Sequence, residues 1–219
     1  MKKLLSLLVI LSTLLLTSCD NDYNPSNNGL YQEIDLCLSV NWAHKNVGAT
    51  ESVLYGEYYA FGEIIADKDT YNWSTYKYTT DTICDPTPDN KTKLEMSDDA
   101  ARVYWKNKWR IPTKEEFQEL IDNCQFVDTT VYGIRVCKII GPNGNSILLP
   151  YAGVCHDEIK SANHKQIGYY ATRNLSEEDN KKCFIFTIDN TDMGSYNIER
   201  KLDVIERCYG VSIRPVKDK

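Results

Sequence analysis

Hydrophobic and polar positions follow three different patterns along this 219-residue chain. Residues 4–16 form a nearly continuous apolar run, and residues 20–29 are polar, contain a proline and a glycine, and have no apolar periodicity. Beyond residue 30, apolar residues recur at the spacings of helices and strands. The pattern predicts a leader (residues 1–18), a flexible tether (residues 19–29) and one folded domain (residues 30–219) that is long enough to bury a core.

The clearest helical pattern covers residues 113–124. Its apolar residues recur at i, i+3, i+4 and i+7: Phe117, Leu120, Ile121 and Cys124. Thr113, followed three residues later by Glu116, is typical of a capping box, in which each side chain satisfies a backbone N–H at the helix start. A second helix is expected at residues 97–104, where a serine and two aspartates precede small and apolar residues.

Strand patterns occupy much of the remaining chain. We expect strands at residues 34–42, 57–61, 133–140, 145–149, 168–172, 182–189, 195–199 and 208–216. Asn143-Gly144 predicts a tight turn between the third and fourth of these. Both alternating sets of residues 182–189 are apolar, which is typical of a strand buried on both faces. Strands, two helices and further strands predict an α+β fold with mostly antiparallel sheets.

The N-terminus has the pattern of a lipoprotein leader. Lys2 and Lys3 precede the apolar run, whose thirteen residues are fewer than the roughly 18–20 that a membrane-spanning helix needs. Leu16-Thr17-Ser18-Cys19 resembles the bacterial lipobox, which implies cleavage before Cys19 and lipid attachment to its sulfur. We therefore expect an exported protein held on a membrane by its N-terminal lipid, at the outer membrane or the cell surface.

Charge and cysteine content narrow the possible partners. After removal of the leader, 23 basic residues face 31 acidic ones, a formal balance of −8 that opposes nucleic-acid binding. Seven cysteines remain besides Cys19, so at least one is free or paired between chains, and no CxxC pair indicates structural zinc. Cys124, Cys137 and Cys183 lie in apolar patterns and are expected to be small buried hydrophobes.

The segment 108–121 contains charged and aromatic residues that could suggest catalysis. Its acids fall on the polar side of the predicted helix, so a solvated surface explains them. Trp109 is expected to pack in the core, Pro112 to fix the approach to the helix cap, and Arg110 to make a structural ion pair. We interpret this segment as a folding motif, together with Arg214 and Pro215 near the C-terminus.

A series of motifs in the same order resembles the Fibrobacter succinogenes major paralogous domain. The motifs are Asp35-Leu36-Cys37-Leu38-Ser39-Val40-Asn41-Trp42-Ala43, Asn46-Val47-Gly48-Ala49, Tyr58-Tyr59-Ala60-Phe61-Gly62-Glu63, Tyr71-Asn72-Trp73-Ser74-Thr75-Tyr76-Lys77, Asp98-Asp99-Ala100-Ala101, Trp109-Arg110-Ile111-Pro112-Thr113 and Gly210-Val211-Ser212-Ile213-Arg214-Pro215-Val216. The resemblance implies a C-type lectin-like fold in an exported lipoprotein of the Bacteroidetes type. It implies no particular chemistry, since a fold does not determine a function.

Two non-enzymatic functions fit these observations. The first is a recognition or adhesion module for glycan or protein ligands, in which exposed aromatic rings stack on sugars or anchor an interface. The tyrosines expected to be exposed are Tyr55, Tyr58, Tyr71, Tyr76, Tyr78, Tyr169, Tyr170 and Tyr196. The alternative is a structural or accessory subunit of an envelope assembly. The triplets that bind calcium and sugar in calcium-dependent lectins are absent from the sequence.

Enzymatic and metal-dependent functions have weaker support. The formylglycine-generating enzymes, to which the family is distantly similar, hold copper with two nearby cysteines, whereas Cys155, Cys183 and Cys208 are far apart in this sequence. His156-Asp157-Glu158 and His164 could offer metal ligands, but their spacing is not typical of a zinc site, and a polar surface loop explains them. We expect no catalytic residues, no cofactor and no metal.

Overall fold

The computed structural model describes residues 31–50, 54–79, 93–106, 108–162, 165–191 and 198–219. These residues form four β-sheets, two α-helices and a short 3₁₀ helix, Met96–Asp98. Every pairing between these strands is antiparallel except the one between β10 (Ile167–Leu175) and β13 (Val211–Ser212). The structure is therefore mixed α+β with mostly antiparallel sheets, as the sequence pattern predicted. No helix in the described part of the chain is long and apolar enough to cross a membrane.

The sheets combine strands from distant parts of the sequence. One contains, in spatial order, β1 (Glu33–Asp35), β2 (Val40–Ala43), β14 (Val216–Asp218) and β4 (Trp109–Arg110). A second contains β12 (Glu199–Glu206), β11 (Lys182–Asp189), β10 (Ile167–Leu175), β13 (Val211–Ser212) and β3 (Tyr58–Tyr59). The third contains β5 (Gln125–Val131), β6 (Ile134–Ile140) and β7 (Ser146–Pro150), and the last is the pair β8 (Val154–His156) and β9 (Ile159–Ala162).

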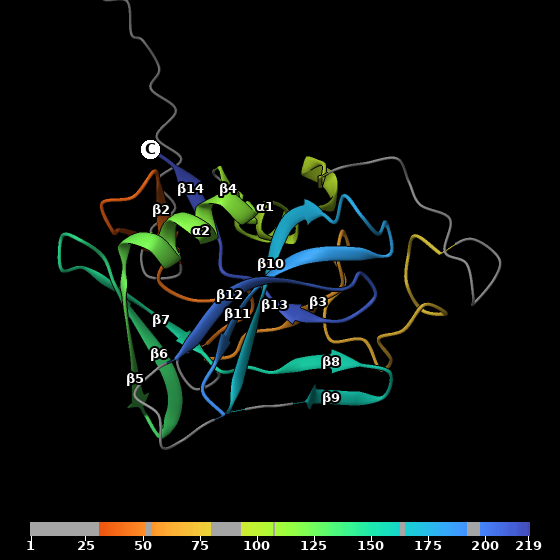
Figure 1. The fold of residues 1–219 in the computed structure, drawn as a ribbon. Coiled ribbons are helices and arrows are strands. Elements are labelled where there is room, and N and C mark those ends of the chain that lie inside the picture. Colours follow the sequence, from red (N-terminus) through yellow and green to blue (C-terminus); the bar gives the residue numbers. More distant parts are fainter. Residues whose placement is uncertain (1–30, 51–53, 80–92, 107, 163–164, 192–197) are drawn as a thin grey trace, which may run out of the picture.

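Helix α2 (Lys114–Asn123) lies over the sheets and closes the main core (Figure 1). The predicted capping box of Thr113 and Glu116 is present at its start. Phe117 of α2 stacks on Phe186 of β11 with ring centroids 4.7 Å apart, and it also contacts Trp42 at 5.1 Å. Because these three rings are fully buried, the apolar helix face predicted from the sequence connects two sheets.

Helix α1 (Ala100–Trp105) covers a second, smaller core. Asp99 caps it by accepting the backbone N–H of Arg102, so the predicted second helix is confirmed with a later start. Trp105 meets Trp109 edge-on at 5.4 Å. Trp42 and Trp109 are 0 % and 3 % exposed, which confirms that they belong to the core.

Several predicted strand boundaries are wrong. Residues 34–42 form two strands, because Cys37 adopts a φ of 64° and donates its backbone N–H to Asp35 Oδ1, which turns the chain. Residues 208–216 likewise contain only the short strand β13 and the start of β14. Strands β4, β5, β8, β9 and β12 were missed; β12 is an edge strand rich in charges, so its only apolar alternation is the short one of Leu202 and Val204. Most of the expected strand 195–199 lies outside the described residues.

The first described strand and the C-terminus lie together. Lys219 Nζ is 2.9 Å from Asp35 Oδ1, and Lys217 pairs with Glu33 at 3.2 Å. In Figure 1 the C-terminus and β14 lie at the upper left, whereas the β8–β9 hairpin lies at the lower right. The domain therefore has one end where the chain enters and leaves, and an opposite end formed by β8, β9 and neighbouring loops.

Candidate functional site

Four of the eight tyrosines expected at the surface are instead inside the protein. Tyr58, Tyr71, Tyr76 and Tyr170 are at most 9 % exposed, which corrects the prediction for these four. Tyr55, Tyr78 and Tyr169 are half-buried, and Tyr196 lies outside the described residues. The most exposed tyrosine described is Tyr132, at 87 %, in the turn between β5 and β6.

Five of these tyrosines nevertheless gather in one aromatic cluster beside β8. Its buried residues are Tyr58, Ala60, Tyr71, Tyr76, Ala152, Cys155 and Cys208, and the partly buried ones are Tyr55, Trp73, Tyr78 and Tyr209. Their distances in sequence gave no sign of this grouping. Because residues 55–79 have few strands of their own, packing between aromatic rings holds this loop-rich region in place.

Backbone carbonyls explain why these phenols are buried. The Tyr71 hydroxyl donates to the carbonyl of Tyr58 at 2.6 Å, and the Tyr76 hydroxyl donates to the carbonyl of Phe61 at 2.7 Å. A buried hydroxyl with a partner avoids the cost of an unmet hydrogen bond. Burial also raises the pKa of Tyr71 and Tyr76 far above the usual value, so both are neutral hydrogen-bond donors.

Arg207 lies within the same cluster and was not identified from the sequence. Its guanidinium lies 5.3 Å from the ring centroid of Phe61, 5.5 Å from Tyr76 and 5.9 Å from Tyr78. Its Nε donates to the Tyr76 hydroxyl at 3.0 Å. The residue is 3 % exposed, so cation–π contacts take the place of water around its charge.

An open pocket of about 210 Å³ lies at the edge of this cluster. It is lined by Tyr58, Asp67, Lys68, Tyr71, Cys155 and Lys160. Two backbone hydrogen bonds of 2.8 Å between Tyr71 and Asp157 join the loop to the β8–β9 hairpin and so fix the pocket's shape. Two tyrosines, a carboxylate and two ammonium groups therefore line a space large enough for one small ring or one side chain.

The charged groups of the pocket differ in how tightly they are held. Lys68 Nζ lies 2.7 Å from the buried carboxylate of Glu63 and donates to the carbonyl of Thr75. Its ammonium group therefore already has two partners within the protein. Lys160 is 57 % exposed and lies 3.8 Å from Asp69, a loose pair. Asp67 is exposed, and its Oδ1 accepts the backbone N–H of Tyr58 at 3.1 Å. Lys160 and Asp67 are thus the groups that a ligand could engage at little structural cost.

Folding brings together two cysteines that are distant in sequence. Cys155 pairs through its backbone with Gly210 and lies in the aromatic cluster with Cys208. The late Cys183 belongs to the smaller core and is 4 % exposed. Burial raises the pKa of both Cys183 and Cys208 to about 12, which keeps these thiols protonated at neutral pH. Cys124 and Cys137 are buried as predicted.

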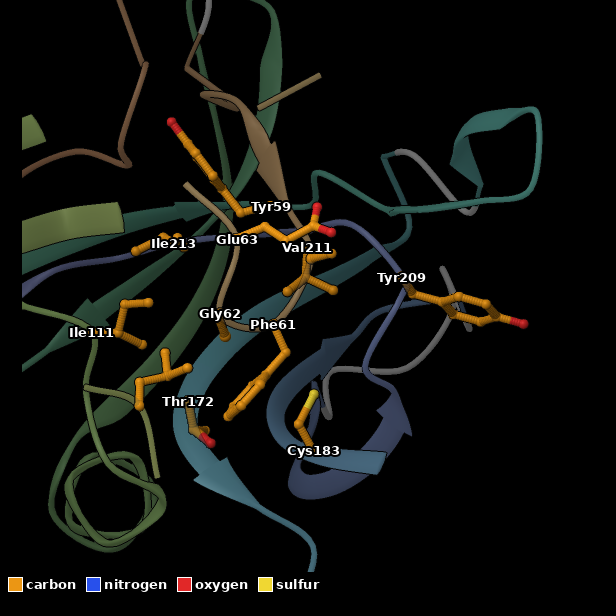
Figure 2. A pocket seen from close by; sticks show the side chains of 13 residues that line it. Tyr59, Phe61, Gly62, Glu63, Ile111, Thr172, Cys183, Tyr209, Val211 and Ile213 are labelled. Carbon is orange, nitrogen blue, oxygen red and sulfur yellow. The ribbon is translucent and has the colours of Figure 1, made fainter. Parts of the chain in front are cut away.

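Two other cavities are less suited to a ligand. The cavity in Figure 2 is bordered by residues such as Phe61, Thr172 and Cys183, holds only about 10 Å³, and has space for one water molecule. The ring of Tyr209, which also borders it, points away (Figure 2). A shallow groove of about 290 Å³ includes Lys114 and Phe184, and Lys114 itself lies over the Phe184 ring at 4.3 Å.

The described part of the histidine-containing loop holds a single histidine, His156. His156 Nδ1 is 3.5 Å from Asp157 Oδ2, and the His156 ring lies 5.4 Å from that of Tyr209. Glu158 is exposed, and His164 lies outside the described residues. No group of three or more histidine, cysteine or acidic side chains is arranged for a metal within the described parts of the chain.

Arg110 of the predicted folding motif makes a structural ion pair. Arg110 forms a two-pronged ion pair with Glu116 and reaches Asp218 of β14. Arg214 is 1 % exposed and donates to Asn46 Oδ1, the carbonyl of Ala43 and the carbonyl of Leu148 at 2.6–2.8 Å. The carbonyl of Pro215 accepts the backbone N–H of Ala43, and that of Pro112 accepts the backbone N–H of Arg173, both at 2.9 Å.

Comparisons with known proteins leave the fold family undetermined. No protein-family model, no curated protein and no solved structure matches this chain.

Proposed function

We propose that this chain is a lipid-anchored recognition module of the cell envelope, attached through Cys19 and built on a C-type lectin-like fold. The lipobox-like leader and the polar tether support the anchor. The mixed α+β structure with mostly antiparallel sheets, together with the ordered motifs that resemble the Fibrobacter succinogenes major paralogous domain, supports the fold assignment. The ligand is a glycan or a protein outside the cell or in the envelope.

The observation that carries this proposal is the pocket at the β8–β9 end. Asp67 and Lys160 offer an acceptor and a donor beside Tyr58 and Tyr71, and this combination suits a sugar ring or a polar side chain. A chain anchored before β1 would hold the pocket on the side away from its anchor, since β14 and the β8–β9 hairpin lie at opposite ends (Figure 1). This placement favours ligands that approach from outside.

The chemistry of the pocket favours binding over catalysis. Lys68 is paired with Glu63, and the Tyr71 hydroxyl is bonded to a carbonyl, so neither is poised to attack a substrate. An accessory role in an envelope assembly is the second proposal, and its binding partner would be a protein subunit.

A binding screen with pocket variants tests the proposal. The purified protein is applied to arrays of glycans and of matrix and envelope proteins, with calcium and with chelator. We expect a specific ligand whose affinity falls ~10-fold in Lys160→Ala, because one charged hydrogen bond is lost. Asp67→Asn removes charge but keeps an acceptor for the Tyr58 N–H, so it should weaken binding without unfolding the loop.

Lys201→Ala is the matched control, because Lys201 is 50 % exposed and lies on β12, away from the pocket. Equal loss in Lys201→Ala and Lys160→Ala would contradict a specific pocket and indicate a general charge effect. A complete absence of glycan binding, with stable capture of an envelope protein, would favour the accessory role.

A further inference from the structure

The edge strand β5 differs from the other long sheet edge of this protein. Strand β12 is an edge of eight residues that includes Glu199, Arg200, Lys201, Asp203 and Glu206. Such charges discourage another strand from adding to an edge. Strand β5 is an edge of seven residues whose single charged side chain is Asp128. It contains no proline and no lysine, and its pairing with β6 has no bulge.

The free backbone groups of β5 can be assigned from its turn. Tyr132 and Gly133 connect β5 to β6 with φ values of 52° and 78°, the signs expected of a two-residue type I′ turn. In such a hairpin the closing pair, Val131 and Ile134, exchanges both hydrogen bonds, and alternate pairs along the ladder do the same. Phe126, Asp128 and Thr130 therefore direct their N–H and C=O groups away from β6.

No strand of the described residues lies beside these outward groups. Among the residues that the structure describes, no backbone hydrogen bond joins Phe126, Asp128 or Thr130 to another segment outside the hairpin. Asp128 and Thr130 are exposed, Val127 is 44 % exposed and Tyr132 is 87 % exposed. Strand β5 thus combines an unpaired edge with accessible apolar side chains at its border.

We propose that β5 pairs with β5 of a second copy of this chain, antiparallel about a two-fold axis at Thr129. In this register Asp128 lies opposite the partner's Thr130, whose hydroxyl can donate to the carboxylate. Val127 lies opposite the partner's Val131, and Thr129 opposite the partner's Thr129. β-Branched pairs of this kind stabilise antiparallel sheets, and an isologous contact closes as a dimer.

The residues of β5 favour this register over axes at Asp128 and at Val127. A two-fold axis at Asp128 would place two carboxylates directly opposite each other, which is unfavourable. An axis at Val127 would place Phe126 opposite the partner's Asp128 and leave Thr130 beyond the end of the partner strand. With the axis at Thr129, each Asp128 stays paired with its own Arg135 at 3.1 Å, and exposed Tyr132 lies beside the partner's Phe126.

The dimer would leave the proposed binding pocket open. Strand β5 lies at the left of Figure 1, and β8 and β9 lie at the right. Each three-stranded sheet would continue into that of the partner, and the two pockets would bind a repetitive ligand together. Two linked sites can raise the apparent affinity well above that of one site.

Disulfide trapping in cell membranes tests the register. All variants carry Cys37→Ser, since Cys37 is exposed and would add its own cross-links. In the proposed dimer the two copies of Thr129 form a non-hydrogen-bonded pair with Cα atoms about 4.5 Å apart, within disulfide range. Thr129→Cys should therefore yield a reducible dimer on oxidation, and Val131→Cys, which faces the partner's Val127, should not. A dimer from Val131→Cys alone, or from neither variant, would overturn this register.

The mass of the full-length protein in detergent tests the pairing itself. We expect the wild type to sediment as a dimer and Thr130→Pro as a monomer, because proline removes an N–H that only the partner strand uses. Thr130→Val keeps that N–H and should remain a dimer. Cooperative unfolding of Thr130→Pro would verify that its monomer is folded. A monomeric wild type at every concentration would refute the proposal.

Discussion

Glu116 binds Arg110 through both carboxylate oxygens and also accepts the backbone N–H of Thr113 at 2.8 Å. One side chain therefore completes the cap of α2 and ties that helix to β4. Because Arg110 also reaches Asp218, the start of the helix is fixed to the last strand of the chain. The hydrogen bonds to these carboxylates raise the pKa of Arg110 further, so it stays charged at any relevant pH.

The first prediction concerns this cap. Thr113→Ala removes the side chain that accepts the Glu116 N–H and should lower the free energy of unfolding by about 1 kcal/mol. Urea denaturation followed by circular dichroism measures the change. Thr191→Ala, at an exposed position outside the helices and strands, is the control and should have almost no effect. Loss of ligand binding in a Thr113→Ala protein of unchanged stability would contradict a purely structural role.

The second prediction concerns the buried guanidinium of Arg214. Arg214→Met keeps much of the side-chain volume but leaves three oxygen acceptors without a donor, each costing about 1–3 kcal/mol when buried. Burial also lowers the pKa of Arg214 to about 10, and the buried charge itself is costly, which offsets part of the loss. We expect a net destabilisation of roughly 3 kcal/mol, measured by urea denaturation. A variant as stable as the wild type would show that the three acceptors find other donors.

The third prediction concerns alkaline pH. Burial raises the pKa of Cys137, Cys183 and Cys208 to about 12, above the ordinary value of 9.0. The stability that these protonated thiols contribute is complete below pH 9 and is lost as the pH rises towards 12, because the unfolded chain releases its protons first. The urea midpoint should therefore fall as the pH is raised from about 8 to about 10. Cys183→Ala should make the urea midpoint fall less steeply with pH. An unchanged dependence on pH would show that the Cys183 thiol does not cause the loss of stability.

The fourth prediction concerns the same thiols at neutral pH. Among the described cysteines, Cys37 is exposed, whereas Cys124, Cys137, Cys183 and Cys208 are buried. Alkylation of the native protein, followed by peptide mass mapping, should modify Cys37 first, because the buried thiols are protonated and covered. Addition of denaturant should make their rates similar. Rapid native labelling of Cys183 would show that the smaller core opens readily.

The fifth prediction concerns the wall of the pocket. A Cβ atom at Gly210 would lie 2.5 Å from Cε1 of Tyr71, which is shorter than a van der Waals contact between two carbon atoms. Gly210→Ala should therefore displace the Tyr71 ring, destabilise the protein by about 1–3 kcal/mol and weaken binding at the pocket. Gly144→Ala has no neighbour within 4 Å but strains a left-handed φ, so it is a control that costs stability without touching the pocket. Equal ligand affinity in Gly210→Ala and Gly144→Ala would show that the position of the Tyr71 ring does not affect binding.

Local patterns in the sequence determined the helices and several strands. The capping box and the spacing of Phe117 and Leu120 define α2 through interactions within one or two turns, and residues 182–189 were identified with their true boundaries. The burial of Trp42, Trp109 and Cys183 also followed from their apolar neighbours. Strand β12 was missed, because charge at an edge hides the alternation that identifies a strand.

Only the tertiary structure decided which tyrosines are exposed and where a pocket forms. Tyrosine has a ring that packs and a hydroxyl that needs a partner, so its burial depends on whether a distant carbonyl lies within reach. For Tyr71 that carbonyl belongs to Tyr58, and for Tyr170 it belongs to Pro150, twenty residues away. The same long-range pairing that joins Tyr71 to Asp157 brings Lys160 to the pocket. No local sequence pattern predicts that these residues lie close together.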